Sequence, residues 1–129
     1  MRIKKGKTMP NMRNIPKSEW RPFFDRMSKA LLGKWAEIEV AQLDLGDQIV
    51  AEWIPLLGVT YDSNDDLLDV ALDRLDHLIY RPKEISVDES PEGLTSVAVV
   101  DGDGARQVVN FKMPLMLPAT EAAASKQTK

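Results

Sequence analysis

Apolar and polar residues alternate in short runs over residues 35–72. In the first run Ile38 and Val40 alternate with Glu37 and Glu39. Because successive side chains of a strand point to opposite sides of a sheet, this spacing places the apolar pair on one face and the acidic pair on the other. The region is therefore predicted to form half-buried antiparallel strands.

Residues 17–33 are predicted to form a helix. Their apolar side chains recur at the spacing of one helix face, at Trp20, Phe23, Phe24, Met27 and Leu31. Ser18 is a candidate N-cap, and Gly33 follows the last periodic residue as a stop signal. Pro22 is tolerated only near a helix start, which leaves Arg21 as an alternative first residue. The aromatic stripe is expected to pack on the sheet rather than to bind a ligand.

Turn residues divide the sheet region. We predict strands at 35–43 and 48–54, joined by a turn at 44–47. Since Pro55 cannot donate to a strand ladder, residues 56–61 are either a new strand or the same strand after a bend.

The next segment carries two competing periods. After a polar turn at 62–66, apolar residues alternate over 68–72 as in a strand, but those of 68–79 also recur at helical spacing. We predict a strand to Leu72 followed by a helical turn over 73–80, with a helix as the alternative.

The strongest hairpin signal lies near the carboxyl end. Asp101-Gly102-Asp103-Gly104 separates apolar runs at 94–100 and 106–112, and Asp-Gly between such runs is typical of a tight turn. A further short strand is predicted where Ile85 and Val87 alternate with Glu84, Ser86 and Asp88.

These segments predict an α+β domain. Its N-terminal helix packs on a curved, mainly antiparallel sheet, or a small open barrel, of five to seven short strands. Residues 15–118 are expected to form this single globular domain, residues 1–14 a basic disordered arm and residues 119–129 a disordered tail. The predicted core contains Trp20, Phe23, Phe24, Ile38, Val40, Val70, Val97, Val99 and Val108.

Composition excludes several kinds of chemistry. The 129-residue chain has no cysteine and one histidine, so neither a thiol nucleophile nor a multi-histidine metal site can form within it. No apolar run approaches the length of about twenty residues that spans a bilayer, and the first residues lack the pattern of a secretory signal. We expect a cytoplasmic protein without a cofactor and without membrane contact.

Charge is divided along the chain. The first 17 residues contribute +6 and the remainder −9 to the net charge of −3. An acidic field repels nucleic-acid phosphates and favours basic partners, so nucleic acid is expected to bind only through the basic arm, if at all. The simpler alternatives are a solubilising tail and a solvated acidic surface.

Asp62, Asp65, Asp66 and Asp69 are the candidate partner-binding residues, for a basic protein or a second copy of the chain. The first residues of this segment resemble the start of a calcium loop. Leu67 replaces the glycine that such a loop needs, which favours an ordinary Asx turn, and no metal site is predicted.

Asp76, His77 and Arg81 are the candidate ligand-binding residues. An aspartate can orient an imidazole for general-base work, and an arginine can hold an anionic substrate. The alternative is structural, because His77 adjoins an apolar run and no nucleophile motif accompanies it.

The motifs IPKSEW, FFDRMS, EIEVAQLDLGDQ, GVTYDSNDD, LDHLIYRPKEISVDE, VVDGDGARQVV and PLMLPA follow one another over residues 15–118. In them the chain resembles an uncharacterised family of small bacterial and archaeal domains of unknown function. The resemblance implies a compact single domain and supplies no activity, ligand or partner.

Two classes of function follow from these observations. One is a non-enzymatic interaction or adaptor module with an acidic sheet surface, and the other is a small ligand-binding domain or enzyme with a pocket around Asp76, His77 and Arg81. The surroundings of His77 distinguish them, because a buried and hydrogen-bonded imidazole is unavailable for catalysis.

Overall fold

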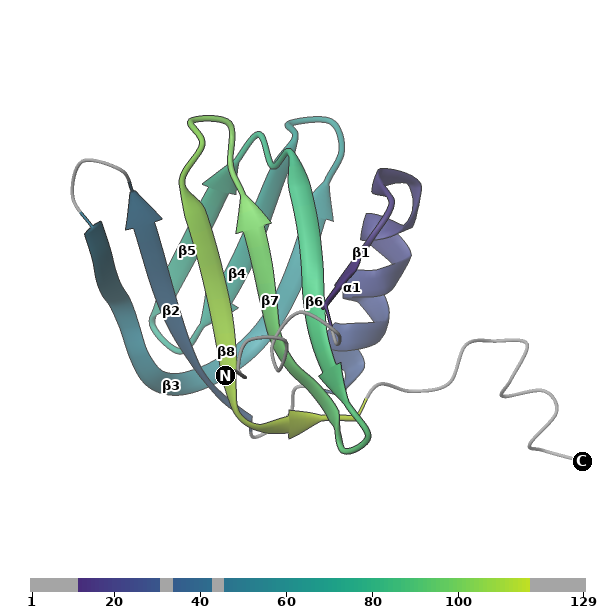
Figure 1. The fold of residues 1–129 in the computed structure, drawn as a ribbon, viewed down its shortest axis with the longest axis vertical. Helices are drawn as coiled ribbons and strands as arrows, with labels where there is room; N and C mark the ends of the chain where they lie inside the picture. The colour runs from purple at the N-terminus through teal and green to yellow at the C-terminus, as the bar shows by residue number, and fades with distance from the viewer. Residues whose placement is uncertain (1–11, 31–33, 43–45, 117–129) are drawn as a thin grey trace, which may run out of the picture.

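The computed structural model describes residues 12–30, 34–42 and 46–116. Figure 1 shows one helix beside a strongly bent sheet. The elements in chain order are β1 (Met12–Asn14), a 3-10 helix (Lys17–Glu19), α1 (Trp20–Lys29), β2 (Trp35–Gln42), β3 (Gly46–Asp62), β4 (Leu67–Leu72), β5 (Leu75–Tyr80), β6 (Glu84–Ser90), β7 (Gly93–Val100) and β8 (Arg106–Leu115).

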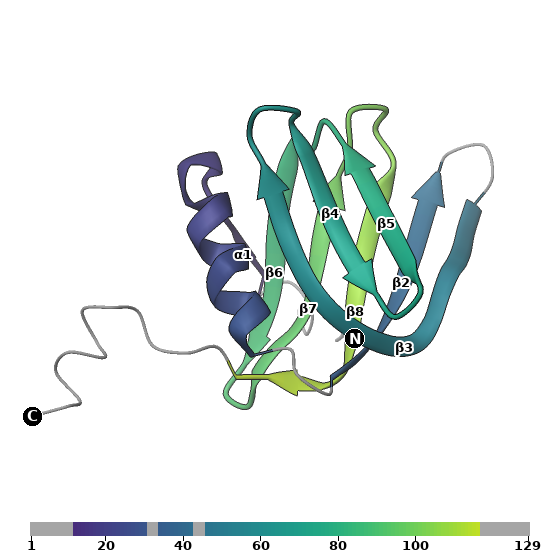
Figure 2. The same cartoon turned by 180° about the vertical axis from the view of Figure 1, so that it is seen from behind.

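The eight strands form one antiparallel sheet in the order β1-β6-β7-β8-β2-β3-β4-β5. β3 pairs with β2 along its first half and with β4 along its second half. Between the halves lies Trp53, which has a φ of 45°, and the pairing shifts register on both sides of this point. The sheet therefore folds over itself: β4 and β5 lie behind β8 and β2 in Figure 1 and in front of them in Figure 2.

The bend in β3 decides between the two alternatives for residues 56–61, a new strand or the same strand after a bend. Residues 48–54 and 56–61 belong to one strand, and Pro55 lies within it. Register shifts and positive φ angles are the usual devices by which a long strand changes direction without ending.

Helix α1 lies along the side of the roll, next to β3, and leaves both outer faces of the sheet uncovered (Figures 1 and 2). Trp20, Phe23, Phe24 and Met27 are buried, which confirms the predicted stripe. The Ser28 hydroxyl donates to the Val59 carbonyl oxygen and accepts from the Val59 amide, both at 2.9 Å. This reciprocal pair fixes the helix against the second half of β3.

The helix boundaries differ from the prediction. Lys17–Glu19 form a 3-10 turn, so the α-helix begins at Trp20 and the Ser18 side chain does not cap it. Pro22 then falls in the first turn, where its missing amide hydrogen costs little. Leu31 and Gly33 lie outside the described residues.

The predicted helical turn over 73–80 is wrong, because β5 occupies Leu75–Tyr80. Asp73 and Arg74 make a two-residue connection, in which Arg74 takes a φ of 66°. β5 then pairs along its whole length with β4, and this ladder satisfies backbone groups that an isolated helical turn would leave open.

The strand count is eight rather than five to seven, and the sheet is open, with β1 and β5 as its end strands. β5 adds one strand, and β1 adds another in Met12–Asn14, which had been assigned to the basic arm. The hairpin at residues 101–104 is confirmed between β7 and β8. Residues 1–11 and 117–129 lie outside the described residues.

The core fills the space between the two layers of the sheet and extends to α1. Most of the predicted core is confirmed, but Val40 is only partly buried and Val108 points away from the core. Val109 takes the inward position instead. Since the two valines are consecutive, a shift of one residue in register exchanges their faces.

Candidate functional site

His77 lies on the inner side of β5, where it takes part in a buried polar chain. Its Nε2 is 2.5 Å from Gln107 Oε1 on β8, and Gln107 Nε2 donates to Asp101 Oδ2 at 2.7 Å. Gln107 and Asp101 are 7% and 9% exposed. Asp101 Oδ1 accepts from the amides of Asp103 and Ala105, which completes the chain within the β7–β8 turn.

The chain of donors fixes the tautomer of His77. The Asp101 carboxylate only accepts, so the Gln107 amide must turn its NH₂ group toward Asp101 and its oxygen toward His77. His77 Nε2 therefore carries a proton and donates to Gln107. This arrangement connects the end strand β5 to β8 through Nε2, the ring nitrogen of His77 that faces the interior.

The structure does not bring Asp76, His77 and Arg81 together. Asp76 is exposed on the outer side of β5, opposite to His77, because neighbouring strand residues point to opposite faces. Arg81 follows β5 and pairs with Asp103 in the β7–β8 turn, with 3.1 Å between Arg81 Nη2 and Asp103 Oδ1.

The four candidate partner-binding aspartates do not form one cluster either. Asp62 Oδ1 accepts from the Asn64 amide at 2.9 Å and stabilises the β3–β4 turn, in which Asp65 is exposed. Asp66 accepts from the Tyr61 hydroxyl at 2.7 Å and lies 3.9 Å from Lys17 Nζ. Asp69 lies outside this turn, in the middle of β4 and on the same face of the sheet as Asp62.

Tyr61 is buried against α1, where its ring meets Trp20 edge to face. Burial, then the hydrogen bond to Asp66, then the charges of Asp66 and Asp62 raise the pKa of Tyr61 to about 12. Asp66 is therefore engaged in holding the turn against the helix.

One outer surface of the roll combines apolar and acidic side chains. We call it the back face: the outward residues of the second half of β3, of β4 and of β5, which face the viewer in Figure 2. Its members are Leu57, Thr60, Asp62, Leu67, Asp69, Ala71, Asp76, Leu78 and Tyr80. Leu57 is 63% exposed, Tyr80 56% and Leu78 36%, and these strand segments contain no lysine or arginine.

Asp69 is the central acidic residue of the back face. Its Oδ1 is buried and has no hydrogen-bond partner among the described residues. Burial, and secondarily the negative charge of Asp76, raise the pKa of the Asp69 carboxyl above its usual 3.8. A buried acceptor without a donor is rare in folded proteins and costs about 1–3 kcal/mol.

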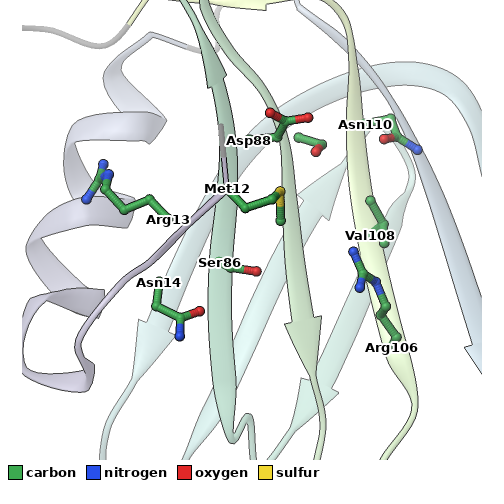
Figure 3. A pocket seen from close by; sticks show the side chains of 9 residues that line it. Met12, Arg13, Asn14, Ser86, Asp88, Arg106, Val108 and Asn110 are labelled. Carbon is green, nitrogen blue, oxygen red and sulfur yellow. The ribbon is translucent and has the colours of Figure 1, made fainter. Parts of the chain in front are cut away.

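The opposite outer surface contains a depression of about 620 Å³. We call this surface the front face: the outward residues of β1, β6, β7, β8, β2 and the first half of β3, on the side that faces the viewer in Figure 1. The depression is lined by Met12, Arg13, Asn14, Ser86, Asp88, Ser96, Arg106, Val108 and Asn110. In Figure 3 the Met12 side chain reaches toward its middle, and Val108 and Asn110 lie on the β8 side.

Sequence reasoning missed Gln107 and Asp101 as interior residues and Leu78 and Tyr80 as surface residues. The alternation of His77, Leu78, Ile79 and Tyr80 was the available signal, but a helical period competed with it.

Among the residues that the structure describes, no group of three or more acidic or histidine side chains is arranged to hold a metal ion. No helix in the described ranges is long and apolar enough to cross a membrane.

Comparison with known sequences now identifies the family. Residues 11–120 match the family of unknown function DUF5335. The chain belongs to this family. An uncharacterized protein of Aquifex aeolicus (strain VF5) is 41% identical over 105 residues, which cover 81% of this chain and 95% of that protein. No solved structure shows significant similarity to the chain.

These findings confirm the resemblance to a domain family of unknown function, and the relative is bacterial. Neither the DUF5335 family nor this relative carries an assigned activity. Function must therefore be argued from the surfaces described above.

Proposed function

We propose that this DUF5335 domain is a binding module, whose back face receives a protein segment that presents lysine or arginine beside aliphatic side chains. The observation that carries the proposal is Asp69 Oδ1, a buried acceptor with no donor among the described residues. An ammonium or guanidinium group from a partner would pair with the Asp69 carboxylate, whose negative charge no internal donor to Oδ1 offsets, and hydrogen bonds to charged groups contribute about 1.5–3 kcal/mol.

The apolar part of the back face supports the same partner. Leu57, Leu78 and Tyr80 are exposed around the aspartates. A mixed surface of this kind suits a partner that buries aliphatic stems while its charged ends reach carboxylates, as lysine and arginine side chains do. Tyr80 adds a rigid aromatic contact of the type that is enriched at interfaces.

Charge also selects the partner. The back face carries Asp62, Asp69 and Asp76 and no basic strand residue. Attraction between such exposed charges acts over about 8 Å at physiological ionic strength, so association should be fast and should weaken as salt rises.

A titration of the isotopically labelled protein with a peptide of alternating lysine and leucine tests the proposal. The amide NMR signals of β4 and β5 should shift, and Asp69→Asn should weaken binding by about tenfold, which corresponds to ~1.4 kcal/mol. Asp65→Asn is the matched control, because it removes the same charge from an exposed turn outside the back face.

Two outcomes would count against the proposal. Equal loss of affinity in Asp69→Asn and Asp65→Asn would indicate general attraction without a site. Shifts confined to β6, β7 and β8, or no binding by the parent protein, would place the interaction elsewhere or remove it.

A further inference from the structure

β5 is the last strand of the layer that faces the viewer in Figure 2, and in the described part of the chain β4 is the one strand that pairs with it. The Tyr80 carbonyl oxygen points away from β4 and accepts from the Gly102 amide at 3.2 Å. Backbone groups alternate in direction along an antiparallel strand, so those of Asp76 and Leu78 also point away from β4. No strand among the described residues pairs with them.

The two end strands of the sheet differ in how their edges are protected. Proteins usually protect a sheet edge, because unpaired backbone groups recruit further strands. β1 has three residues, and Arg13 within it pairs with Glu89. β5 has six residues, contains no lysine and no proline, and pairs with β4 without a shift in register. It therefore lacks the short length, the lysines and the bulges with which sheet edges are usually protected.

Apolar side chains are exposed on both sides of β5. Leu78 and Tyr80 belong to the back face. Leu75 lies on the inner side with His77 and Ile79, and it is nevertheless 40% exposed. The interior of the roll is thus incompletely covered along β5. A strand paired with this edge would place alternate side chains over the inner and the outer apolar residues, as an extended peptide does when it extends a sheet.

Charge indicates which strand fits this edge. Asp76 on β5 and Asp69 on the neighbouring β4 lie on the back face, and neither strand contains lysine or arginine. Arg74 and Arg81 lie outside β5, before and after it, and Arg81 is already paired with Asp103. A second copy of β5 would bring the same aspartates to one surface, whereas a basic segment would bring the opposite charge. The charges therefore favour a basic strand over a second copy of the chain.

Building on the proposed function, we propose that the partner segment adds to β5 as an antiparallel ninth strand, with its basic side chains on the back face. A basic residue opposite Asp76 then forms a direct cross-strand pair. A basic residue opposite Leu78 lies two strand spacings from Asp69, about 10 Å, which a lysine or arginine side chain can bridge. A third, opposite Tyr80, lies beside the exposed ring. The aliphatic side chains alternate with these and cover Leu75 on the inner side.

Two N-methylated forms of the lysine-leucine peptide test this arrangement. In the antiparallel ninth strand the lysine amides point toward β5 and the leucine amides point away, because opposite residues exchange their hydrogen bonds. N-methylation of the lysine amides removes several of these bonds and should weaken binding by at least about tenfold. N-methylation of the leucine amides is the matched control, with the same side chains and charge, and should change the affinity by less than about threefold.

Amide hydrogen exchange in the full chain gives a second measurement. In the free protein the Leu78 amide should exchange rapidly, whereas the Ile79 amide, which points toward β4, should exchange slowly. Saturating unmodified peptide should slow the exchange of Leu78, because its amide then donates to the ninth strand.

Equal affinities of the two methylated peptides, a greater loss for the leucine-methylated form, or unchanged Leu78 exchange with saturating peptide would overturn the ninth strand. Slow exchange of Leu78 in a free protein that is dimeric would also overturn it, because a second copy would then occupy the edge. In the first three outcomes the unmodified peptide still binds, so the binding module of the back face stands. Failure of the unmodified peptide to bind would instead remove the module and the ninth strand together.

Discussion

The imidazole of His77 on β5 and the amide of Gln107 on β8 meet across the interior of the rolled sheet, with 2.5 Å between Nε2 and Oε1. The contact joins the end strand of one layer to a central strand of the other. Through this contact the single histidine of the chain donates inward, on the opposite side of β5 from Asp76.

Gln107→Leu should destabilise the fold. The change leaves Asp101 Oδ2 and His77 Nε2 without the partners seen here, and an unsatisfied buried group costs about 1–3 kcal/mol. Urea unfolding should show a lower midpoint with an unchanged slope. Gln48→Leu, at an exposed position of β3, is the control and should change stability by less than about 0.5 kcal/mol. Equal midpoints for both variants would remove the proposed role of the polar chain.

Phe24→Ala should cost about 3–5 kcal/mol, because this side chain is completely buried between α1 and the sheet. Phe24→Leu keeps most of the apolar volume and should cost less. A loss below about 1 kcal/mol for the alanine variant in urea would place this helix face outside the core.

The sequence predicted those elements whose pattern had one interpretation. The aromatic stripe of α1, the alternation of β2 and the Asp-Gly turn between β7 and β8 each pointed to one structure, and each is confirmed. β1 was missed because three residues carry no period, and the strand forms through pairing with β6, which is distant in the sequence.

Other elements could not be predicted, because strand pairing between distant segments determines them and a local sequence pattern does not show that pairing. Residues 75–80 fit a helix or a strand, and the ladder to β4 decided between them. Two consecutive valines at 108 and 109 could each face inward, and register decided. The candidate site was grouped by proximity along the chain, but neighbours on a strand point apart, so Asp76 and His77 were separated.

Ionisation of the Tyr61 hydroxyl should lower the stability of the fold at high pH. Its folded pKa of about 12 exceeds the usual value of 10.0, so the folded state holds the proton more tightly than the unfolded state. The stabilisation is complete below pH 10 and is lost as the pH rises toward 12, by on the order of 2 kcal/mol.

Tyrosinate absorbance measures this directly. The chain has two tyrosines, so Tyr80→Phe isolates the signal of Tyr61. Asp66→Asn removes one of the charges that raise the pKa of Tyr61 and should lower it. An unchanged pKa in that variant would mean that Asp66 does not contribute to its value.

The central claim is that the Asp69 carboxylate on the back face binds a lysine or arginine side chain of a partner. Carbon-13 NMR of the side-chain carboxyl, followed against pH, gives the pKa of Asp69 in the free protein and with saturating lysine-leucine peptide. The account predicts a value above 3.8 in the free protein, caused by burial and Asp76, and a clear fall when the peptide is bound. A pKa that does not move while the peptide occupies the domain would contradict it.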